Sequence, residues 1–527
     1  MSGSGSYQFA PEERPAFPGS PFAPSHPIKR RLAYAAIGIV TGIGSTFGNA
    51  LINVNVPSLS GPLGLYVAEA SWLPAIYVAM NATANLTLVK ARTQFGIPAV
   101  THTLLIVYAL VGLLQFPFPG FATAVAVRAV CGITAAGLTT LTIYYMMQAF
   151  PAKLRPLALV AGIGLPQLGT PLARLVPVDV LAMNGWHGLH LIEPALAIVI
   201  LVLITLLPLP PSERSKVFEP LDFVTIALAI PAMLLLCGVL GLGRILWWAD
   251  TPWLGWMLAA AIPFFAAAIL IEVNRRRPLL QIGWMGSGDI LRFAAVALLV
   301  RLALAEQTYG SVGLLTSGGL NNDQLHVLFG FVALAMVLGI VAAAVSMREP
   351  RLRWQVLVAA LIIAAGAFLD SGATNVTRPP QLYLSQALIG FGTTLFIGPA
   401  LVFGFLRMFV KGSGHLVSFV VLFSTTQNVG GLAGSALLGT YQVIQTRAHA
   451  AALSEHLAAA DPQVAQRLQS GAALLQQRLM VEANILAYND VFRLVAMLAL
   501  MTAAYVFYLI IRAARRARRE ALAGALA

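Results

Sequence analysis

Apolar runs of membrane-spanning length, separated by short polar segments, recur along the chain from near Leu32 to near Ile511. A hydrocarbon core about 30 Å thick is crossed by ~20 residues of α-helix, and backbone groups that face lipid must be bonded within their own segment. Each run therefore predicts a transmembrane helix. The predicted spans are approximately 32–56, 70–90, 97–118, 121–149, 155–181, 189–209, 221–244, 253–272, 289–314, 325–347, 354–371, 380–409, 414–444 and 487–511.

Basic residues gather in alternate connections between these spans. Lys29 to Arg31 precede the first span, Arg275 to Arg277 follow the eighth, and Arg512 to Arg519 follow the last. Short cytoplasmic loops collect Lys and Arg, so both termini are expected to be cytoplasmic. The net charge of +13 then reflects topology and contact with anionic lipid, and not nucleic-acid binding.

The composition agrees with a membrane protein. Hydrophobic residues make up 58% of the chain and charged residues only 10%, against roughly a quarter charged residues in soluble domains. We therefore expect an all-α membrane protein with about fourteen transmembrane helices.

Few residues suggest chemistry other than transport. The two cysteines, Cys131 and Cys237, lie in separate spans and are interpreted as packing residues. His187 and His190 lie in an outer loop, where such a pair is more often solvated than metal-bound. A phosphate-cradling P-loop is absent from the sequence, which argues against ATP-driven transport by this chain. We expect neither an enzyme nor a cofactor or metal site.

The spans divide the chain into two related parts. Small residues crowd segments 162–171 and 427–440, which become equivalent if the seventh and eighth spans are an insertion. The predicted organisation is a disordered cytoplasmic tail (1–31), an N-terminal six-helix half (32–209), an inserted helix pair with flanking loops (210–288), a C-terminal six-helix half (289–511) that includes an outer loop (445–486), and a basic cytoplasmic tail (512–527).

The outer loop 445–486 is long and has helical periodicity. Asp461-Pro462 is expected to break it into two helices, because a residue before proline avoids the helical region. Two interpretations stay open. The loop is either an amphipathic hairpin that rests on the bilayer or the protein, or a docking element for a periplasmic partner.

Charged residues inside a bilayer are costly and are functional candidates by default. Arg128, Arg301, Glu193 and Glu306 lie within predicted spans, and Arg174 and Asp370 lie in or at the ends of others. A buried carboxylate can load and release a proton, so Glu306 and Glu193 are candidates for proton coupling. The alternative for Glu306 is that it neutralises a buried arginine such as Arg128 or Arg301.

Polar stripes mark three spans. Side chains four positions apart share a helix face, and such groups need partners or water inside a membrane. The stripes comprise Asn49 and Asn53, then Tyr77, Asn81 and Asn85, and finally Gln427 and Asn428. They are candidates for lining a substrate cavity; interhelical hydrogen bonds that fix packing are the alternative.

Several motifs, taken in order, resemble the 14-spanner drug/proton antiporter branch of the major facilitator superfamily. They are GNALINVNVP at 48–57, Arg128 followed by Gly132, LPQLGT at 165–170 (like GPxLGG), the FDxxG-like entry at 218–222, and QNVGG at 427–431. The resemblance implies two six-helix halves with two inserted central helices, and an antiporter-type helix motif that includes Pro166, Gly169 and Pro171.

Two of the departures from the family pattern remove acidic residues, and others are the loss of motif glycines at Leu165 and Thr170. The aspartate of the family's first span falls on Gly48, and the acidic residue of the loop after its second span falls on Thr93. If proton coupling is present, the resemblance then leaves Glu306 or Glu193 to supply the carboxylate.

The resemblance implies a secondary transporter of the bacterial inner membrane that exports amphipathic organic compounds by alternating access, with proton antiport as a possible coupling. The expected partners are a small organic substrate, the lipid bilayer and a periplasmic membrane-fusion adaptor. Two alternatives stay open, an uncoupled facilitator or lipid-handling transporter, and a degenerate membrane scaffold.

Overall fold

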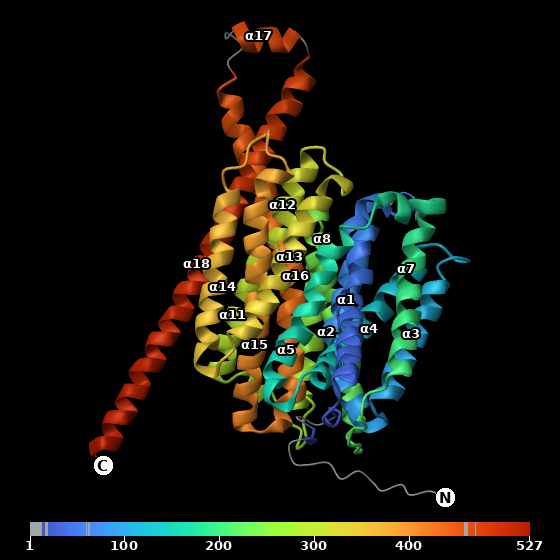
Figure 1. Ribbon diagram of the computed structural model, residues 1–527. Coiled ribbons are helices and arrows are strands. Elements are labelled where there is room, and N and C mark those ends of the chain that lie inside the picture. Colours follow the sequence, from blue (N-terminus) through green and yellow to red (C-terminus); the bar gives the residue numbers. More distant parts are fainter. Residues whose placement is uncertain are drawn as a thin grey trace, which may run out of the picture.

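The computed structural model describes residues 13–15, 19–59, 61, 64–457, 462–469 and 471–526. Helices dominate this part of the chain, and most of the long ones run roughly parallel or antiparallel to one another (Figure 1). Helix α1 begins and α18 ends at the same end of the bundle, which we call the terminus end. Helix α17 lies beyond the opposite end, which we call the hairpin end.

The first group of helices packs around α1 and α4. It consists of α1 (Ile28–Leu59), α2 (Val67–Phe95), α3 (Ile97–Leu113), α4 (Phe121–Ala149), α5 (Arg155–Gly164), η3 (Leu165–Leu168), α6 (Gly169–Ala173) and α7 (Val178–Leu206). Helix α1 contacts α4, α6 and α7, and α3 contacts α7.

The second group packs around α15 and α18. It consists of α10 (Ile282–Met285), α11 (Gly288–Leu304), α12 (Glu306–Ser317), α13 (His326–Val345), α14 (Leu352–Asp370), α15 (Tyr383–Lys411), α16 (Leu416–Glu455), α17 (Pro462–Gln469) and α18 (Ala472–Leu526). Helix α15 contacts α13 and α14, and α18 contacts α11, α14 and α16.

Helices from the two groups meet on both sides of the bundle. Helix α5 packs on α13 and α15, while α2 packs on α16. The pair α8 (Pro220–Leu246) and α9 (Pro252–Val273) lies beside the contact between α2 and α16. Helix α8 packs on both of these helices and on α9. The α8–α9 pair, which is predicted to be an insertion, is therefore in contact with both groups.

One close approach explains the broken fifth span. The chain tightens from α5 into the 3₁₀ turn η3 at Pro166 and resumes as α6. The Thr46 hydroxyl of α1 donates a hydrogen bond of 2.5 Å to the carbonyl of Pro166. A Cβ on Gly169 would overlap the Thr46 hydroxyl and lie 3.0 Å from the Phe47 amide nitrogen, so glycine is required for this helix contact.

Eleven helical segments within the described residues are long and apolar enough to cross a membrane. Three further predicted spans coincide with helices that are shorter, more polar or interrupted. Helix α3 is apolar but shorter, α2 is richer in polar residues, and α11 and α12 are separated by a break at Ala305. The all-helical membrane class is confirmed, and the count of fourteen spans stays a prediction.

Part of the predicted disordered tail is ordered against the protein. Ser20 is fully buried, and the backbone amide of Phe22 donates to the carbonyl of Pro211 at 3.0 Å. The Gln148 amide donates to the Phe22 carbonyl at 2.9 Å, and its oxygen lies 2.9 Å from the His26 ring. Residues 19–31 thus differ from the expectation, because buried polar groups of α4 bind their backbone; residues 1–12 and 16–18 lie outside the described residues.

The outer loop projects away from the bundle and does not rest on it. Helices α16 and α18 continue past their predicted ends and carry α17 at the tip (Figure 1). The expected break occurs before Pro462, where α17 begins; Asp461 itself lies outside the described residues. The basic tail 512–527 likewise continues α18, as far as Leu526 in the described part.

Candidate functional site

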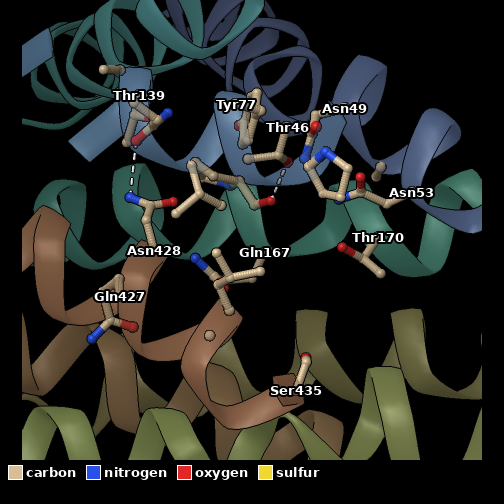
Figure 2. Close-up of a pocket in the computed structure, with 18 of the residues that line it drawn as sticks. Thr46, Asn49, Asn53, Tyr77, Thr139, Gln167, Thr170, Gln427, Asn428 and Ser435 are labelled. Atoms are coloured by element: carbon tan, nitrogen blue, oxygen red, sulfur yellow. Dashed lines mark hydrogen bonds between the residues drawn. The ribbon is translucent and has the colours of Figure 1, made fainter. Parts of the chain in front are cut away.

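A cavity of about 1230 Å³ lies between the two groups of helices. Its wall is formed by α1, α2, α4, η3 and α6 on one side, by α11, α12, α15 and α16 on the other, and by the end of α8. Figure 2 shows the labelled side chains of α1, α2 and η3 facing those of α16 across this space.

All seven residues predicted from polar stripes line this cavity: Asn49, Asn53, Tyr77, Asn81, Asn85, Gln427 and Asn428. Convergence on one cavity is the arrangement expected for substrate lining, although two members also fix packing. Asn428 donates a hydrogen bond of 2.9 Å to the Asn81 side chain, and Asn81 donates to the carbonyl of Gly132 at 3.1 Å.

Other amide groups of these stripes remain without a partner. The side-chain oxygens of Asn49 and Asn85 and the side-chain nitrogen of Gln427 are buried and have no hydrogen-bond partner among the described residues. Unpaired buried polar atoms cost about 1–3 kcal/mol each. A bound ligand or water would satisfy them.

Four arginines also border the cavity: Arg92, Arg174, Arg244 and Arg301. Arg301 was predicted as a buried charge whose partner was a carboxylate. Instead its Nε donates to the backbone carbonyl of Gln427 at 2.8 Å. The interpretation that Glu306 neutralises this arginine is therefore wrong, because the two side chains leave opposite sides of the α11–α12 break toward different neighbours.

Arg128 finds its partner in Glu193. These residues of α4 and α7 form an ion pair through Nη2 and Oε2, and both are almost completely buried. A paired buried charge is tolerated, whereas removal of one partner costs about 3–5 kcal/mol. Glu193 is thus committed to an ion pair with Arg128, which makes it a weaker candidate for proton exchange than Glu306.

Glu306 lies in a cluster with Gln386 and Asp370. The Gln386 amide nitrogen donates to Glu306 Oε1 at 3.1 Å and to Asp370 Oδ2 at 2.7 Å. All three residues are buried, and Glu306 Oε2 has no hydrogen-bond partner among the described residues. Two ionised carboxylates sharing one neutral amide would repel in a medium of low dielectric, so this cluster can hold a proton.

The position of the cluster links it to the cavity. Glu306 begins α12, directly after the break at Ala305. Arg301 on one side of this break and Tyr309 on the other both line the cavity. Glu306 therefore lies on the chain segment that forms part of the cavity wall.

Hydrogen bonds join the two groups of helices at the hairpin end of the cavity. Arg174 Nη1 donates to the Asn322 side-chain oxygen at 3.1 Å, and the Asn322 side-chain nitrogen donates to the Arg174 carbonyl at 3.2 Å. The Val178 amide donates to Asp323 Oδ1 at 3.1 Å. These bonds must break if the cavity is to open at this end.

A charge network at the terminus end ties α2 to the inserted pair. Asp222 Oδ2 accepts a bond of 2.6 Å from Lys90, and Asp222 Oδ1 lies 2.9 Å from Arg275 Nη2. Arg275 also binds Glu272 at 2.8 Å and Glu219 at 3.0 Å. Burial alone lowers the pKa of Arg275, but its bonds to these carboxylates more than offset this and hold the pKa above its ordinary value.

This network lies in the region where the sequence departs from the family loop. Thr93 carries no charge, and Lys90, three residues earlier, binds Asp222 in the first turn of α8. The predicted antiporter-type motif lies elsewhere, in η3 and α6. Pro166 lines the cavity, and Gly169 and Pro171 lie in α6, packed toward α1.

Sequence reasoning missed several members of the site. Gln386 was unmarked because a glutamine at one helix position carries no signal of its own. Arg244 was overlooked because it lies near the end of a span, where arginine is common. Its Nη1 lies 3.4 Å from the Tyr309 hydroxyl of α12, a contact between helices that are distant in the sequence.

Comparisons with known proteins agree with this fold. The family model described as Major Facilitator Superfamily matches residues 38–435. The "MFS thioclapurine efflux transporter tcpA" of Claviceps purpurea (strain 20.1) is 21% identical over 349 residues, 62% of this chain and 62% of that relative. The crystal structure of the human organic anion transporter MFSD10 (TETRAN) is similar in fold, with a TM-score of 0.53 and 15% identity, over 90% of this chain and 100% of the other.

The chain spans less than two thirds of the length of its fungal relative, and the structural likeness concerns the fold. The match to the family model extends from α1 into α16 and so includes the residues of both groups that line the cavity. The 14-spanner branch stays a prediction. The chain belongs to the Major Facilitator Superfamily and is a multi-pass membrane protein.

Proposed function

We propose that this protein exports amphipathic organic compounds from the cytoplasm across a bacterial inner membrane in exchange for protons. The cavity, which is bordered by polar and apolar groups from both helix groups, is the substrate site. Its two ends open alternately as the groups rock about it. The clustering of Lys and Arg in alternate connections supports a cytoplasmic terminus end.

The observation that carries the proposal is the Glu306–Gln386–Asp370 cluster. A proton is held there because one amide nitrogen serves two buried carboxylates. Its release ionises a group at the first turn of α12, where the helix N-terminus favours negative charge. Because this turn follows the break beside the cavity wall, proton loading and cavity opening act on the same segment.

The test is transport by purified protein in proteoliposomes with an imposed pH gradient. Glu306→Gln removes the titrating group but keeps a side chain of the same size. We expect gradient-driven uptake to fall at least tenfold, while exchange of labelled for unlabelled substrate without a gradient persists. Glu455→Gln, at an exposed position at the end of α16, is the matched control and leaves both activities unchanged.

Equal gradient-driven transport by Glu306→Gln and by the unmodified protein would contradict proton coupling at this cluster. One observation favours a second candidate, an uncoupled facilitator. Arg128 already neutralises Glu193, and Gly48 lacks a carboxylate. For this candidate, transport rates do not change when the pH gradient is collapsed.

A further inference from the structure

The charge balance of the cavity indicates what kind of molecule it holds. This inference rests on the proposed transport function and concerns the substrate's charge. Four arginines line the cavity, and none of them has a carboxylate partner among the described residues. The two acidic lining residues, Asp179 and Asp323, lie at the hairpin-end rim, and both are exposed.

The arginines instead bind neutral groups. Arg174 lies over the Phe329 ring at 4.9 Å and Arg244 over the Tyr309 ring at 5.1 Å. Arg92 lies 6.0 Å from the centre of the Tyr144 ring. Such contacts compensate a cation only partly, and a desolvated charge without a counter-ion is costly. The cavity is therefore electropositive when it is empty.

Of the four arginines, Arg301 is the best placed to donate hydrogen bonds to a ligand. Its Nε is fixed by the Gln427 carbonyl at 2.8 Å, and its two terminal nitrogens have no hydrogen-bond partner among the described residues. A Cβ on Gly431 would lie 3.0 Å from Nη2, so this glycine leaves the room that the guanidinium occupies. The unpaired side-chain nitrogen of Gln427 adds a further donor on the same turn of α16.

Arg244 supplies a second cation from the inserted pair. It crosses from α8 to the Tyr309 hydroxyl and packs where Gly439 has no side chain. Gly431 and Gly439 are eight residues apart on α16, so the two guanidinium groups meet this helix at points separated by about 12 Å. Between these points the wall contains Leu432 and Ser435, so apolar and hydroxyl groups separate the two cations.

We propose that the substrate is an amphipathic organic anion whose carboxylate, sulfonate or phosphate group binds Arg301. Two oxygens of such an oxyanion can accept hydrogen bonds from the two free nitrogens of a guanidinium group. The apolar body of the molecule lies against Val420, Phe423 and Leu432, which border the same cavity. Arg244 then binds a second acidic or polar group of a longer substrate.

Arg301 also has a structural explanation, since its Nε bond ties α11 to α16. That role requires one donor at Nε and leaves the terminal nitrogens and the unpaired Gln427 amide unexplained. The experiment must therefore separate loss of anion binding from loss of folding.

The test uses the full chain in lipid nanodiscs and three fluorescent probes with the same apolar body: 1-pyrenebutyrate, its methyl ester and 1-pyrenebutylamine. We expect the carboxylate to bind at least tenfold more tightly than the ester or the amine. Arg301→Gln should remove this preference while ester binding stays unchanged, which also shows that the variant is folded. Arg378→Gln, at an exposed loop position, makes the same change in net charge and should have no effect.

Equal or tighter binding of the amine, or a carboxylate preference that survives Arg301→Gln, would overturn the proposal. If Arg301→Gln does not fold, Arg244→Gln tests the same electropositive cavity, and an unchanged carboxylate preference then counts against it. Probe binding needs no pH gradient, so failure of the anion inference can be distinguished from failure of the proposed proton-coupled export. Arginine-dependent anion binding without gradient-driven transport refutes only the coupled export, and gradient-driven transport of the amine refutes only the anion inference.

Discussion

The carboxylate of Glu193 occupies the space beside Gly48, where the resemblance places an aspartate. A Cβ on Gly48 would lie 3.0 Å from Glu193 Oε1 and 2.9 Å from the Tyr108 hydroxyl. Glu193 uses its other oxygen to bind Arg128. The negative charge opposite Arg128 therefore comes from α7 in this protein, and the glycine in α1 makes room for it.

This arrangement predicts that the charge can be moved between helices. Glu193→Ala should lower stability by about 3–5 kcal/mol, because Arg128 is left buried without a partner. Gly48→Asp alone should also destabilise, since it adds a second carboxylate beside the first. The double variant Gly48→Asp/Glu193→Ala should recover a substantial part of the loss. Thermal unfolding in detergent measures all three, and a double variant no better than its worse parent would contradict the exchange.

The hydrogen bonds at the hairpin end predict how the cavity opens there. Asn322→Ala removes the pair of bonds to Arg174, each worth about 1 kcal/mol. The population of the state that is open at the hairpin end should therefore rise by about fivefold per bond lost. The readout is the rate at which a membrane-impermeant maleimide labels Gln167→Cys in the cavity wall. Asn321→Ala is the control, because the Asn321 side chain binds Gln324 within its own loop. Equal labelling rates in both variants would count against a gate at Asn322.

The network that joins α2 to the inserted pair predicts a stabilising role for Asp222. Asp222→Asn leaves Lys90 and Arg275 with fewer carboxylate partners and should lower stability by about 1–3 kcal/mol. Asp289→Asn removes a carboxylate that is 65% exposed and pairs with Arg292 at 3.3 Å. Such an exposed pair contributes about 0–1 kcal/mol. An unfolding temperature lowered equally by both substitutions would show that the buried network adds nothing specific.

The contact of α6 with α1 predicts a sharp difference between two glycines. Gly169→Ala forces a methyl group against the Thr46 hydroxyl and should cost about 1–3 kcal/mol. Gly330→Ala meets no atom within 4 Å and should be neutral or slightly stabilising, because alanine favours helix by about 1 kcal/mol. Unfolding temperatures measure both. If Gly169→Ala is as stable as Gly330→Ala, the close approach does not constrain the fold.

The sequence predicted the parts of this molecule that depend on local pattern. Apolar runs located the helices, and a four-residue period placed Tyr77, Asn81 and Asn85 on one face, which the structure turns toward the cavity. The four-residue period shows which side chains share one face of a helix. It carries no information about which neighbour that face meets.

Partners between distant helices were therefore beyond the sequence. Arg128 and Glu193 are 65 residues apart, and Glu306 and Gln386 are 80 apart. Each is an isolated polar residue in an apolar run, and only packing decides which of them pair. The same holds for the ordered tail, where polar groups of α4 at Gln148 provide bonds that no pattern within residues 19–31 reveals.

The uninterrupted course of α18 has a mechanical consequence. Its 55 residues form one rod of about 82 Å that runs from the terminus end through the bundle to the projecting hairpin. A stiff lever magnifies small rotations, so a tilt of a few degrees where α18 packs on α14 and α16 displaces the hairpin by several ångströms. Distance labels on α17 would therefore follow the transport cycle from outside the lipid, without any probe inside the translocation path.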